Sequence, residues 1–219
     1  MCGKFTMLAW DDVLGVVQAL EASAPLNLQP DWPACRDAVP GSEACVVAAG
    51  SGALEPLRLT WGFPLSGSGK LVFNTRSENA ASSPLWRDAF LNRRCIVPAW
   101  AFFESHRTET ERGASGRPRR RQYRFLPEGG GGPLLMAGIW QDGRFSVLTC
   151  APDDRVRPVH DRMPLLLSAS SALDWAAGAA PEECRSAVAL EASTQSGRPP
   201  LDGGDGCDVG GAGAQMALF

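Results

Sequence analysis

The sequence predicts an α+β fold built mostly from antiparallel sheets. Short runs of alternating, β-branched or aromatic residues are many, whereas helical patterns are few. Strands and helices do not alternate in the β-α-β order that a parallel sheet requires. The length of 219 residues suits one domain with a short appendage, and it is enough to bury most of the apolar surface.

The first predicted helix covers residues 11–22, with Asp11 as its N-cap. Its apolar side chains fall on one face, at Val13, Leu14, Val17 and Leu20. Strands are expected over 44–49, 54–61 and 70–74, and the second of these alternates Leu57, Leu59 and Trp61.

A second helix is predicted to begin at Ser83 as N-cap with Pro84 at its first position. An apolar, aromatic strand follows over 95–103, and its Pro98 indicates a sheet edge or a bulge. Residues 107–120 are charged and rich in Gly, Ser and Arg. They predict a hairpin tip or a disordered loop, with a DNA-touching arm as the alternative.

The remaining elements are strands over 121–126, 133–140, 144–151 and 164–167 and a helix over 170–178. Beyond about residue 193 the sequence turns to SGRPPLDGGDG, which is linker composition. We therefore expect a domain over 1–193 and a Gly-rich flexible linker or tail over 194–214.

The segment 215–219 resembles the pentapeptide by which many bacterial DNA-processing proteins dock on the replication sliding clamp. Gln215 would hydrogen-bond at the rim of an apolar pocket that Leu218 and Phe219 fill. The alternative is that this apolar segment folds back onto the domain.

Composition excludes several classes of protein. The net charge of −3 argues against a globally basic nucleic-acid protein, so any phosphate contact needs a local basic face. The candidates for such a face are Lys4, Arg58, Arg76, Arg87, Arg93 and Arg94. No membrane span or secretory signal is recognisable, so we expect a cytoplasmic protein without disulfides. With two histidines and no C-x-x-C pair, we expect no metal and no cofactor.

Cys2 is the first residue with distinctive chemistry. Methionine aminopeptidase removes Met1 when the second residue is small, and this would leave Cys2 with a free α-amine beside its thiol. Because an α-amine has a pKa of about 7.7–8.0, a useful fraction is neutral and nucleophilic at pH 7. Such a 1,2-aminothiol forms a Schiff base with an aldehyde and then closes a thiazolidine ring. Gly3 lets a substrate approach closely.

Three further polar residues stand at the ends of predicted strands or between them. Asn74 opens NTRSE, Glu104 ends the aromatic strand, and His160 lies in PVHDRMPLLL. Each has a purely structural alternative explanation. Asn74 could form a turn, Glu104 could stand where a strand meets water, and His160 could be a hydrogen-bonded histidine of the core.

Together, the segments resemble the SRAP family (SOS response-associated peptidase, also called abasic-site processing protein). The matching stretches are MCGKF at the start, LNLQP at 26–30, LTWGF at 59–63, NTRSE at 74–78, RRCIVPAWAFFES at 93–105, MAGIW at 136–140 and VHDRMPLLL at 159–167.

The resemblance implies two packed antiparallel sheets in an open barrel with flanking helices and a groove for single-stranded DNA. It implies that Cys2 is the nucleophile that cross-links to abasic sites, that Asn74 positions the amine and the sugar, and that Glu104 is the general acid/base. It implies that His160 assists Schiff-base formation as the proton donor to the sugar oxygen. It also implies DNA contacts, which we expect from Gly3, Lys4, Arg76, Arg87 and Arg162, with Arg76 on a phosphate.

This chain departs from the family pattern at several places. The segment FPLSGSGK lacks the aromatic residues that family members carry after the WG motif. Ser105 replaces a Trp, Ala101 a Gly and Lys4 an Arg, and the end of the domain lacks the usual closing strand pattern. Base stacking stabilises binding by about 1–3 kcal/mol per base, so DNA affinity is expected to be weaker here.

The sequence leaves three alternative functions. A class II amidotransferase also starts with MCG, but this chain lacks the Arg-Gly-Pro segment of those enzymes. General proteolysis through Cys2 and a non-enzymatic DNA-binding relic are the other two readings.

Overall fold

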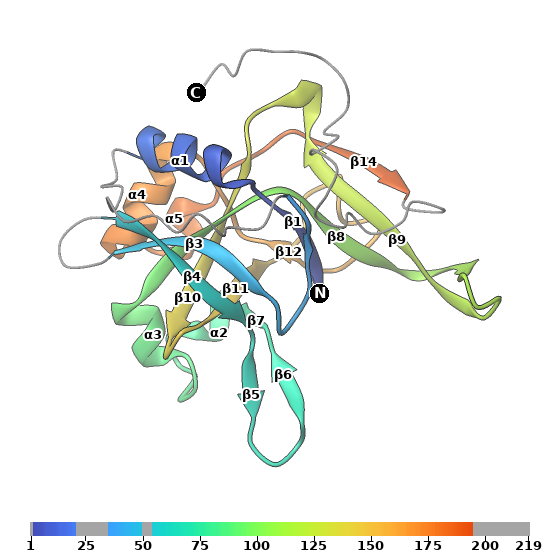
Figure 1. The fold of residues 1–219 in the computed structure, drawn as a ribbon, viewed down its shortest axis with the longest axis horizontal. Helices are drawn as coiled ribbons and strands as arrows, with labels where there is room; N and C mark the ends of the chain where they lie inside the picture. Colours follow the sequence, from blue (N-terminus) through green and yellow to red (C-terminus); the bar gives the residue numbers. More distant parts are fainter. Residues whose placement is uncertain (1, 21–34, 50–53, 195–219) are drawn as a thin grey trace.

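The computed structural model describes residues 2–20, 35–49 and 54–194. It is an α+β fold in which nearly all strands join one large, mostly antiparallel sheet, with helices at its flanks (Figure 1). This confirms the predicted fold class. The expected two packed sheets are in fact one sheet that curls round on itself, together with a separate small hairpin.

Five strands form a ring at the centre. They are β3 (Glu43–Ala49), β4 (Leu54–Trp61), β8 (Arg94–Arg112), β10 (Leu134–Gln141) and β11 (Arg144–Cys150). Each pairs with the next in the order β8-β10-β11-β4-β3, and β3 pairs again with β8. The contact between β11 and β4 is parallel and short, whereas the other four are antiparallel.

The remaining strands extend this ring. They are β1 (Lys4–Met7), β2 (Asp37–Ala38), β7 (Asn74–Arg76), β9 (Pro118–Pro127), β12 (Met163–Pro164), β13 (Leu166–Leu167) and β14 (Leu190–Thr194). A separate hairpin, β5 (Phe63–Leu65) with β6 (Lys70–Val72), projects from the body, as does the distal part of the β8–β9 ribbon (Figure 1).

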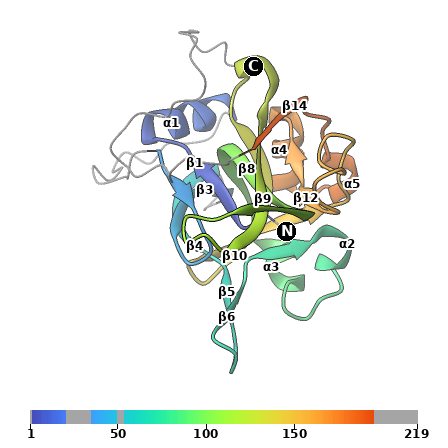
Figure 2. The same cartoon turned by 90° about the vertical axis from the view of Figure 1, so that its right-hand side faces the viewer.

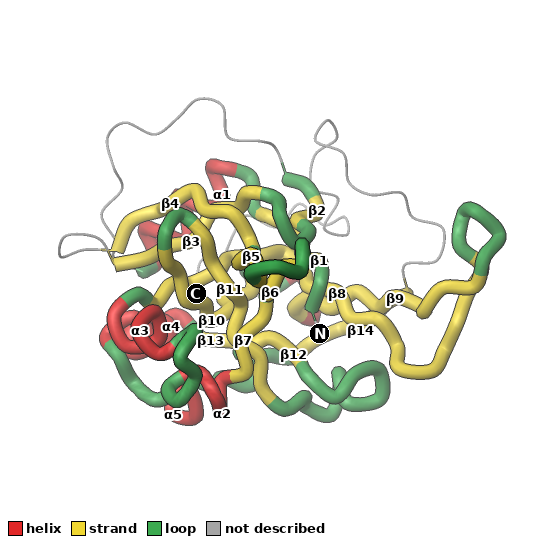
Figure 3. Tube along the Cα trace, turned by 90° about the horizontal axis from the view of Figure 1, so that it is seen from below, coloured by secondary structure: helices red, strands yellow, loops and turns green. Residues whose placement is uncertain are grey.

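The helices are α1 (Trp10–Ala19), α2 (Ser77–Ala80), α3 (Arg87–Asn92), α4 (Ala169–Ala177) and α5 (Pro181–Cys184), and a 3₁₀ turn covers Glu128–Gly130. Figure 2 shows α1 on one side of the strands and α4 with α5 on the other. In Figure 3, α3, α4 and α5 gather at one end of the molecule and the β8–β9 ribbon extends from the other.

Two predicted helix starts were wrong. The N-cap of α1 is Ala9 rather than Asp11, and no side chain caps it. Helix α3 begins at Arg87 rather than Pro84, because residues 84–86 form turns before it. The predicted helix over 170–178 is confirmed as α4, and the Ser168 hydroxyl caps it by accepting a hydrogen bond from the backbone N–H of Ser171.

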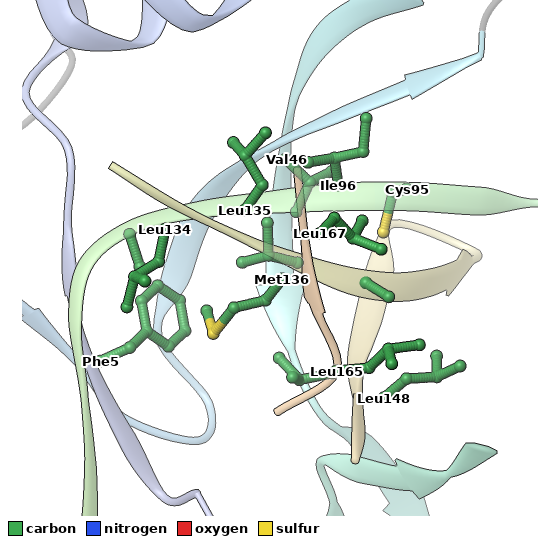
Figure 4. Close-up of a cluster of buried hydrophobic side chains, with 14 of the residues drawn as sticks. Phe5, Val46, Cys95, Ile96, Leu134, Leu135, Met136, Leu148, Leu165 and Leu167 are labelled. Carbon is green, nitrogen blue, oxygen red and sulfur yellow. The ribbon is translucent and has the colours of Figure 1, made fainter. Parts of the chain in front are cut away.

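Apolar side chains from the ring strands and β1 fill the core (Figure 4). The buried side chains labelled there include Phe5, Val46, Ile96, Met136, Leu148 and Leu167. Burying a side chain of this size stabilises the fold by about 1.5–3 kcal/mol relative to leaving it in water. The apolar side chains that alternate along the predicted strands therefore form the core inside the ring.

Trp61 fixes the start of the chain to this core. It is fully buried, and its indole N–H donates a 2.8 Å hydrogen bond to the carbonyl oxygen of Phe73. The ring of Phe5 packs against it with centroids 4.8 Å apart. Since Phe5 stands three positions after Cys2, this contact holds the segment that carries Cys2 against the sheet.

Gly138 of the MAGIW segment is required by a close approach of strands. A Cβ atom there would lie 2.8 Å from Sγ of Cys95 and 3.0 Å from Cγ2 of Val97 on the neighbouring β8. Any side chain at this position would push β10 and β8 apart, which explains a glycine within a strand interior.

Of the two predictions for Pro98, a sheet edge or a bulge, the edge is wrong, whereas the β1–β8 pairing has a register shift just after Pro98, between Ala99 and Ala101. Strand β8 is interior, with β10 along one side and β3 and then β1 along the other. Pairing with β3 ends at Ile96 and pairing with β1 begins at Ala99. Pro98 is therefore not on a sheet edge but in the interval between two partners, where its missing N–H interrupts neither of these ladders.

Residues 107–120 form the tip of a hairpin, which confirms the first of the two structures predicted for them. Strand β8 continues to Arg112, and β9 returns from Pro118. The closing strand that the sequence did not reveal is present as β14, antiparallel to β9 from Leu190 to Thr194. Its sequence, LEAST, buries only Leu190 and so lacks a strand's apolar alternation.

Of the cysteines in the described residues, Cys2, Cys45, Cys95, Cys150 and Cys184 are free thiols. Among the described residues, no helix has the length and apolar character needed to cross a membrane. Gln215, Leu218 and Phe219 lie outside the described residues, and clamp binding stays a prediction.

Candidate functional site

Cys2 lies at the entrance to β1, beside the end of the buried part of β8. The two strands run antiparallel with Lys4 opposite Phe103, so the residue after Phe103, Glu104, faces the segment before Lys4. Cys2 is completely buried, and its thiol donates to the carbonyl oxygen of Lys4 over 3.4 Å.

The Cys2 thiol is protonated at neutral pH. Burial raises its pKa to about 12, and the negative charge of Glu104 raises it as well. Three smaller effects lower the pKa: backbone hydrogen bonds at Lys4 and at Phe103, and the positive amino terminus of the chain. The thiolate is therefore not the resting form of this residue.

Asn74 is the first residue of β7, which runs parallel to β11 with Asn74 opposite Val147. Its side chain is 9% exposed, and its Nδ2 donates a 2.7 Å hydrogen bond to the carbonyl oxygen of Cys2. The other end of the amide, Oδ1, is buried and accepts no hydrogen bond from any described residue. Asn74 thus orients the Cys2 backbone and presents an acceptor to the same site.

Glu104 continues β8 beyond its aromatic stretch, and its side chain is fully enclosed. The alternative explanation for Glu104, that a strand end simply meets water here, is therefore wrong. Burial raises the pKa of Glu104 to about 7. The amino terminus lowers the pKa through its charge and a hydrogen bond, whereas Asp161 raises it. Glu104 can consequently both hold and release a proton near neutral pH.

His160 lies just before β12, with its side chain 16% exposed, and its Nε2 is 3.9 Å from Oε2 of Glu104. Burial lowers the pKa of His160, and the positive amino terminus lowers it further. Asp161, whose Oδ1 is 3.0 Å from Nδ1, raises it. The imidazole is therefore neutral at pH 7, and the backbone N–H of Arg162 donates to Nδ1 over 3.0 Å.

The four residues that the sequence singled out thus converge from four separate segments. A carboxyl group with a pKa of about 7 stands beside a neutral imidazole, next to a buried thiol and the amide that holds its backbone. Such a group of side chains can accept and donate protons at pH 7 without a metal ion.

The predicted DNA-contacting residues lie in different environments. Gly3 is half-buried, and Lys4 places its ammonium 3.9 Å from the centre of the Phe103 ring and 3.3 Å from Oδ2 of Asp37. Arg76 and Arg87 are exposed, and neither side chain makes a hydrogen bond or ion pair with another described residue. Their roles in DNA binding stay predictions.

Arg162 is already engaged within the protein. Its guanidinium forms a double hydrogen bond with the carboxylate of Glu78 and also donates to Thr149. Sequence reasoning assigned no role to Glu78, although this residue closes the NTRSE segment that carries Asn74. Its position in that segment was the signal that could have identified it.

Other candidates for a basic face serve the fold. Arg94 is buried, and its guanidinium donates to the carbonyl oxygens of Phe90, Trp175 and Ala179. It also stacks on the aromatic rings of Phe90 and Trp175. It is therefore not available to DNA. Arg93 pairs with Asp88, and Arg58 pairs with Glu43.

The segment without aromatics, FPLSGSGK, forms the β5–β6 hairpin. Phe63 at its base packs edge-on against Trp86 with centroids 5.0 Å apart. Leu65 near the turn is 47% exposed. The hairpin thus offers one aliphatic side chain near its tip.

The sequence matches the family described as SOS response associated peptidase (SRAP) over residues 1–196. Two curated relatives are similar to it. Abasic site processing protein YoaM of Bacillus subtilis is 24% identical over 191 residues, which cover 80% of this chain and 78% of the relative. Abasic site processing protein YedK of Escherichia coli is 24% identical over 184 residues, covering 80% and 79%.

Solved structures share the fold. A protein from Bordetella bronchiseptica superposes with a TM-score of 0.64 at 22% identity, over 88% of this chain and 99% of that one. A protein from Bacteroides thetaiotaomicron gives a TM-score of 0.64 at 17% identity, over 88% and 91%.

Proposed function

The chain belongs to the SRAP family, and from this premise we propose that it captures abasic sites in single-stranded DNA covalently through Cys2, as part of the response to DNA damage. Removal of Met1 would make the α-amine of Cys2 the amino terminus. The observation that carries the proposal is the convergence of Asn74, Glu104 and His160 on the start of the chain.

The first step is opening of the sugar. An abasic deoxyribose is mainly a closed hemiacetal, so its C1 hydroxyl must lose a proton and its ring oxygen must gain one before the aldehyde appears. Glu104, with a pKa of about 7, can accept the first proton, and His160 can supply the second through Nε2.

The second step joins protein and DNA. The lone pair of the Cys2 amine adds to the aldehyde carbon, and a proton passes from the nitrogen to the oxygen, which gives a carbinolamine. The carbinolamine loses its hydroxyl as water with a proton from Glu104, and its nitrogen returns a proton to Nε2 of His160. The product is an imine. The Cys2 sulfur then adds to the imine carbon while its proton passes to the imine nitrogen, which closes the thiazolidine. One water leaves, and nothing is oxidised or reduced.

A protonated thiol suits this order of events. Since the amine attacks first and the sulfur second, Cys2 does not need to be a thiolate at rest. The sulfur adds within the same residue, and such intramolecular steps have very high effective concentrations.

Peptide hydrolysis is less well supported. A cysteine peptidase relies on a thiolate as its nucleophile. Here burial and the charge of Glu104 both raise the pKa of the Cys2 thiol. The family description names a peptidase, but the environment of this thiol favours a reaction in which the amine acts first.

The proposal is tested by incubating the purified protein with single-stranded DNA that carries one abasic site. We expect a protein–DNA band that survives heating in detergent. DNA with a chemically reduced abasic site has no aldehyde and serves as the matched control. A band of equal strength with the reduced DNA would refute the proposal.

A further inference from the structure

Arg162 connects three elements that lie around the site. Its Nη1 and Nη2 bind Oε1 and Oε2 of Glu78 at 2.6 and 2.9 Å, which is the fork geometry of an arginine–carboxylate pair. Its Nη2 also donates to the carbonyl oxygen of Thr149 at 2.5 Å and reaches the Thr149 hydroxyl at 3.3 Å.

The strand order explains why this side chain is well placed. Thr149 of β11 lies opposite Arg76 of β7 on one side and opposite Pro164 of β12 on the other. Arg162 immediately precedes β12, and Glu78 follows β7 in α2. The Arg162 side chain therefore spans β11 and links the segment that carries His160 to the segment that carries Asn74.

The backbone of the same residue contacts His160. A backbone N–H can only donate, so the 3.0 Å bond from Arg162 N to Nδ1 requires a lone pair on Nδ1. In the neutral imidazole the proton is then on Nε2, the atom that lies 3.9 Å from Glu104.

Asp161 favours the opposite arrangement. Its Oδ1 lies 3.0 Å from the same Nδ1, and a carboxylate can only accept, so it attracts a proton to Nδ1. Of the other charged groups acting on His160, the amino terminus and Arg107 are positive and Glu104 can be negative. Two groups thus compete at Nδ1 of His160: the Arg162 N–H, which keeps the proton on Nε2, and the Asp161 carboxylate, which favours a proton on Nδ1.

We propose that Glu78 is a positioning residue: by clamping the Arg162 side chain, it keeps the Arg162 N–H on His160 Nδ1 and so presents Nε2–H toward Glu104. The Arg162 side chain is 16% exposed, against 39% for Arg58 in its pair with Glu43, whereas the two carboxylates, Glu78 and Glu43, are about equally exposed. The effect on cross-linking rests on the proposed function, whereas the tautomer of His160 does not.

The first measurement is the tautomer, from ¹⁵N shifts of labelled histidine by NMR. The chain has only two histidines, so a His106→Gln variant identifies the His160 signals. We expect Nε2–H in the unchanged protein, a mixture of tautomers or a protonated ring in Glu78→Ala, and an intermediate result in Glu78→Gln, which keeps one acceptor oxygen. Glu43→Ala breaks a comparable ion pair on β3–β4 and is expected to change nothing.

The second measurement separates chemistry from binding. At saturating abasic DNA we expect Glu78→Ala to cross-link about 10-fold more slowly, a part of the roughly 10²- to 10⁴-fold that a general acid/base supplies. DNA affinity is not expected to fall, since a carboxylate is removed. In an Arg162→Ala background, Glu78→Ala is expected to have no further effect, because Glu78 acts through Arg162.

An unchanged His160 tautomer in both Glu78→Ala and Glu78→Gln overturns the proposal, and so does an additive effect in the double variant. If the unchanged protein forms no cross-link, the proposed function fails. The NMR result still decides the role of Glu78. If Glu78→Ala does not fold, Glu78→Gln carries both measurements.

Discussion

The side-chain amide of Asn74 donates a 2.7 Å hydrogen bond to the carbonyl oxygen of Cys2, although 72 positions separate the two residues. The bond joins β7 to the start of the chain and fixes the backbone that would carry the reacting amine. Because the same amide leaves Oδ1 buried without a donor among the described residues, it also offers an acceptor for that amine or for a sugar hydroxyl.

Asn74→Ala is expected to slow cross-linking about 5- to 150-fold, since leaving a buried group unsatisfied costs about 1–3 kcal/mol. Asn74→Asp should be no better, because a carboxylate cannot donate to the Cys2 carbonyl. Single-turnover rates at saturating abasic DNA measure this. Asn79→Ala, in the exposed part of α2, is the control. A normal rate in Asn74→Asp would show that the hydrogen bond is dispensable.

Ionisation of Glu104 is expected to destabilise the fold as pH rises. Its pKa is raised by burial from 4.5 to about 7, so the neutral form is favoured in the folded state. The stability that this contributes is complete below about pH 4.5 and is lost as pH rises through about 7. A shift of this size corresponds to about 3 kcal/mol.

Urea unfolding of the unchanged protein and of Glu104→Gln checks this. The variant stays neutral, so its stability relative to the unchanged protein is expected to increase by up to about 3 kcal/mol between pH 4.5 and pH 8. Glu191→Gln, at an exposed position of β14, should show no such trend. A pH-independent difference for Glu104→Gln would mean that Glu104 is not held in its neutral form.

Glu104 and His160 are expected to act on rate rather than on DNA affinity. Glu104→Ala and His160→Ala should each slow bond formation roughly 10²-fold, a typical contribution of general acid/base catalysis. Rates at saturating DNA and dissociation constants for intact single strands separate the two effects. Loss of affinity with unchanged chemistry on bound DNA would contradict the roles assigned here.

Arg76 is expected to contact a phosphate. It is exposed, stands two positions after Asn74, and makes no side-chain hydrogen bond or ion pair with another described residue. Arg76→Ala should weaken DNA binding. It should also reduce the magnitude of the slope of log K against log salt concentration by about 1. Titrations at several salt concentrations measure this slope. An unchanged slope would remove Arg76 from the DNA interface.

Much of the fold could be predicted because the apolar pattern of the ring strands is strong. The alternation that predicted 54–61 matches β4, and the helix predicted over 170–178 is α4. The two features that were missed, a closing strand and the correct start of α3, lack such local signals. Strand β14 buries one residue, and α3 begins without a side-chain cap. Their form depends on tertiary contacts that no local pattern records.

The four candidate residues could be chosen from motifs, but their environments could not. Nothing in the segment that ends in Glu104 indicates that its carboxyl is enclosed and carries a pKa of about 7. The engagement of Arg162 with Glu78 also joins segments 84 positions apart. Charge pairing over such a separation becomes visible only when β7, β11 and β12 lie side by side.

The central claim is that Cys2 itself bonds to the abasic site through both its amine and its sulfur. Mass spectrometry of the digested protein–DNA product tests it most directly, alongside Cys2→Ser and a variant that retains Met1. We expect the DNA remnant on Cys2 alone, at most a labile adduct with Cys2→Ser, and no stable product when Met1 is retained. A remnant on Cys45 or Cys95, or a heat-stable product from Cys2→Ser, would contradict the claim.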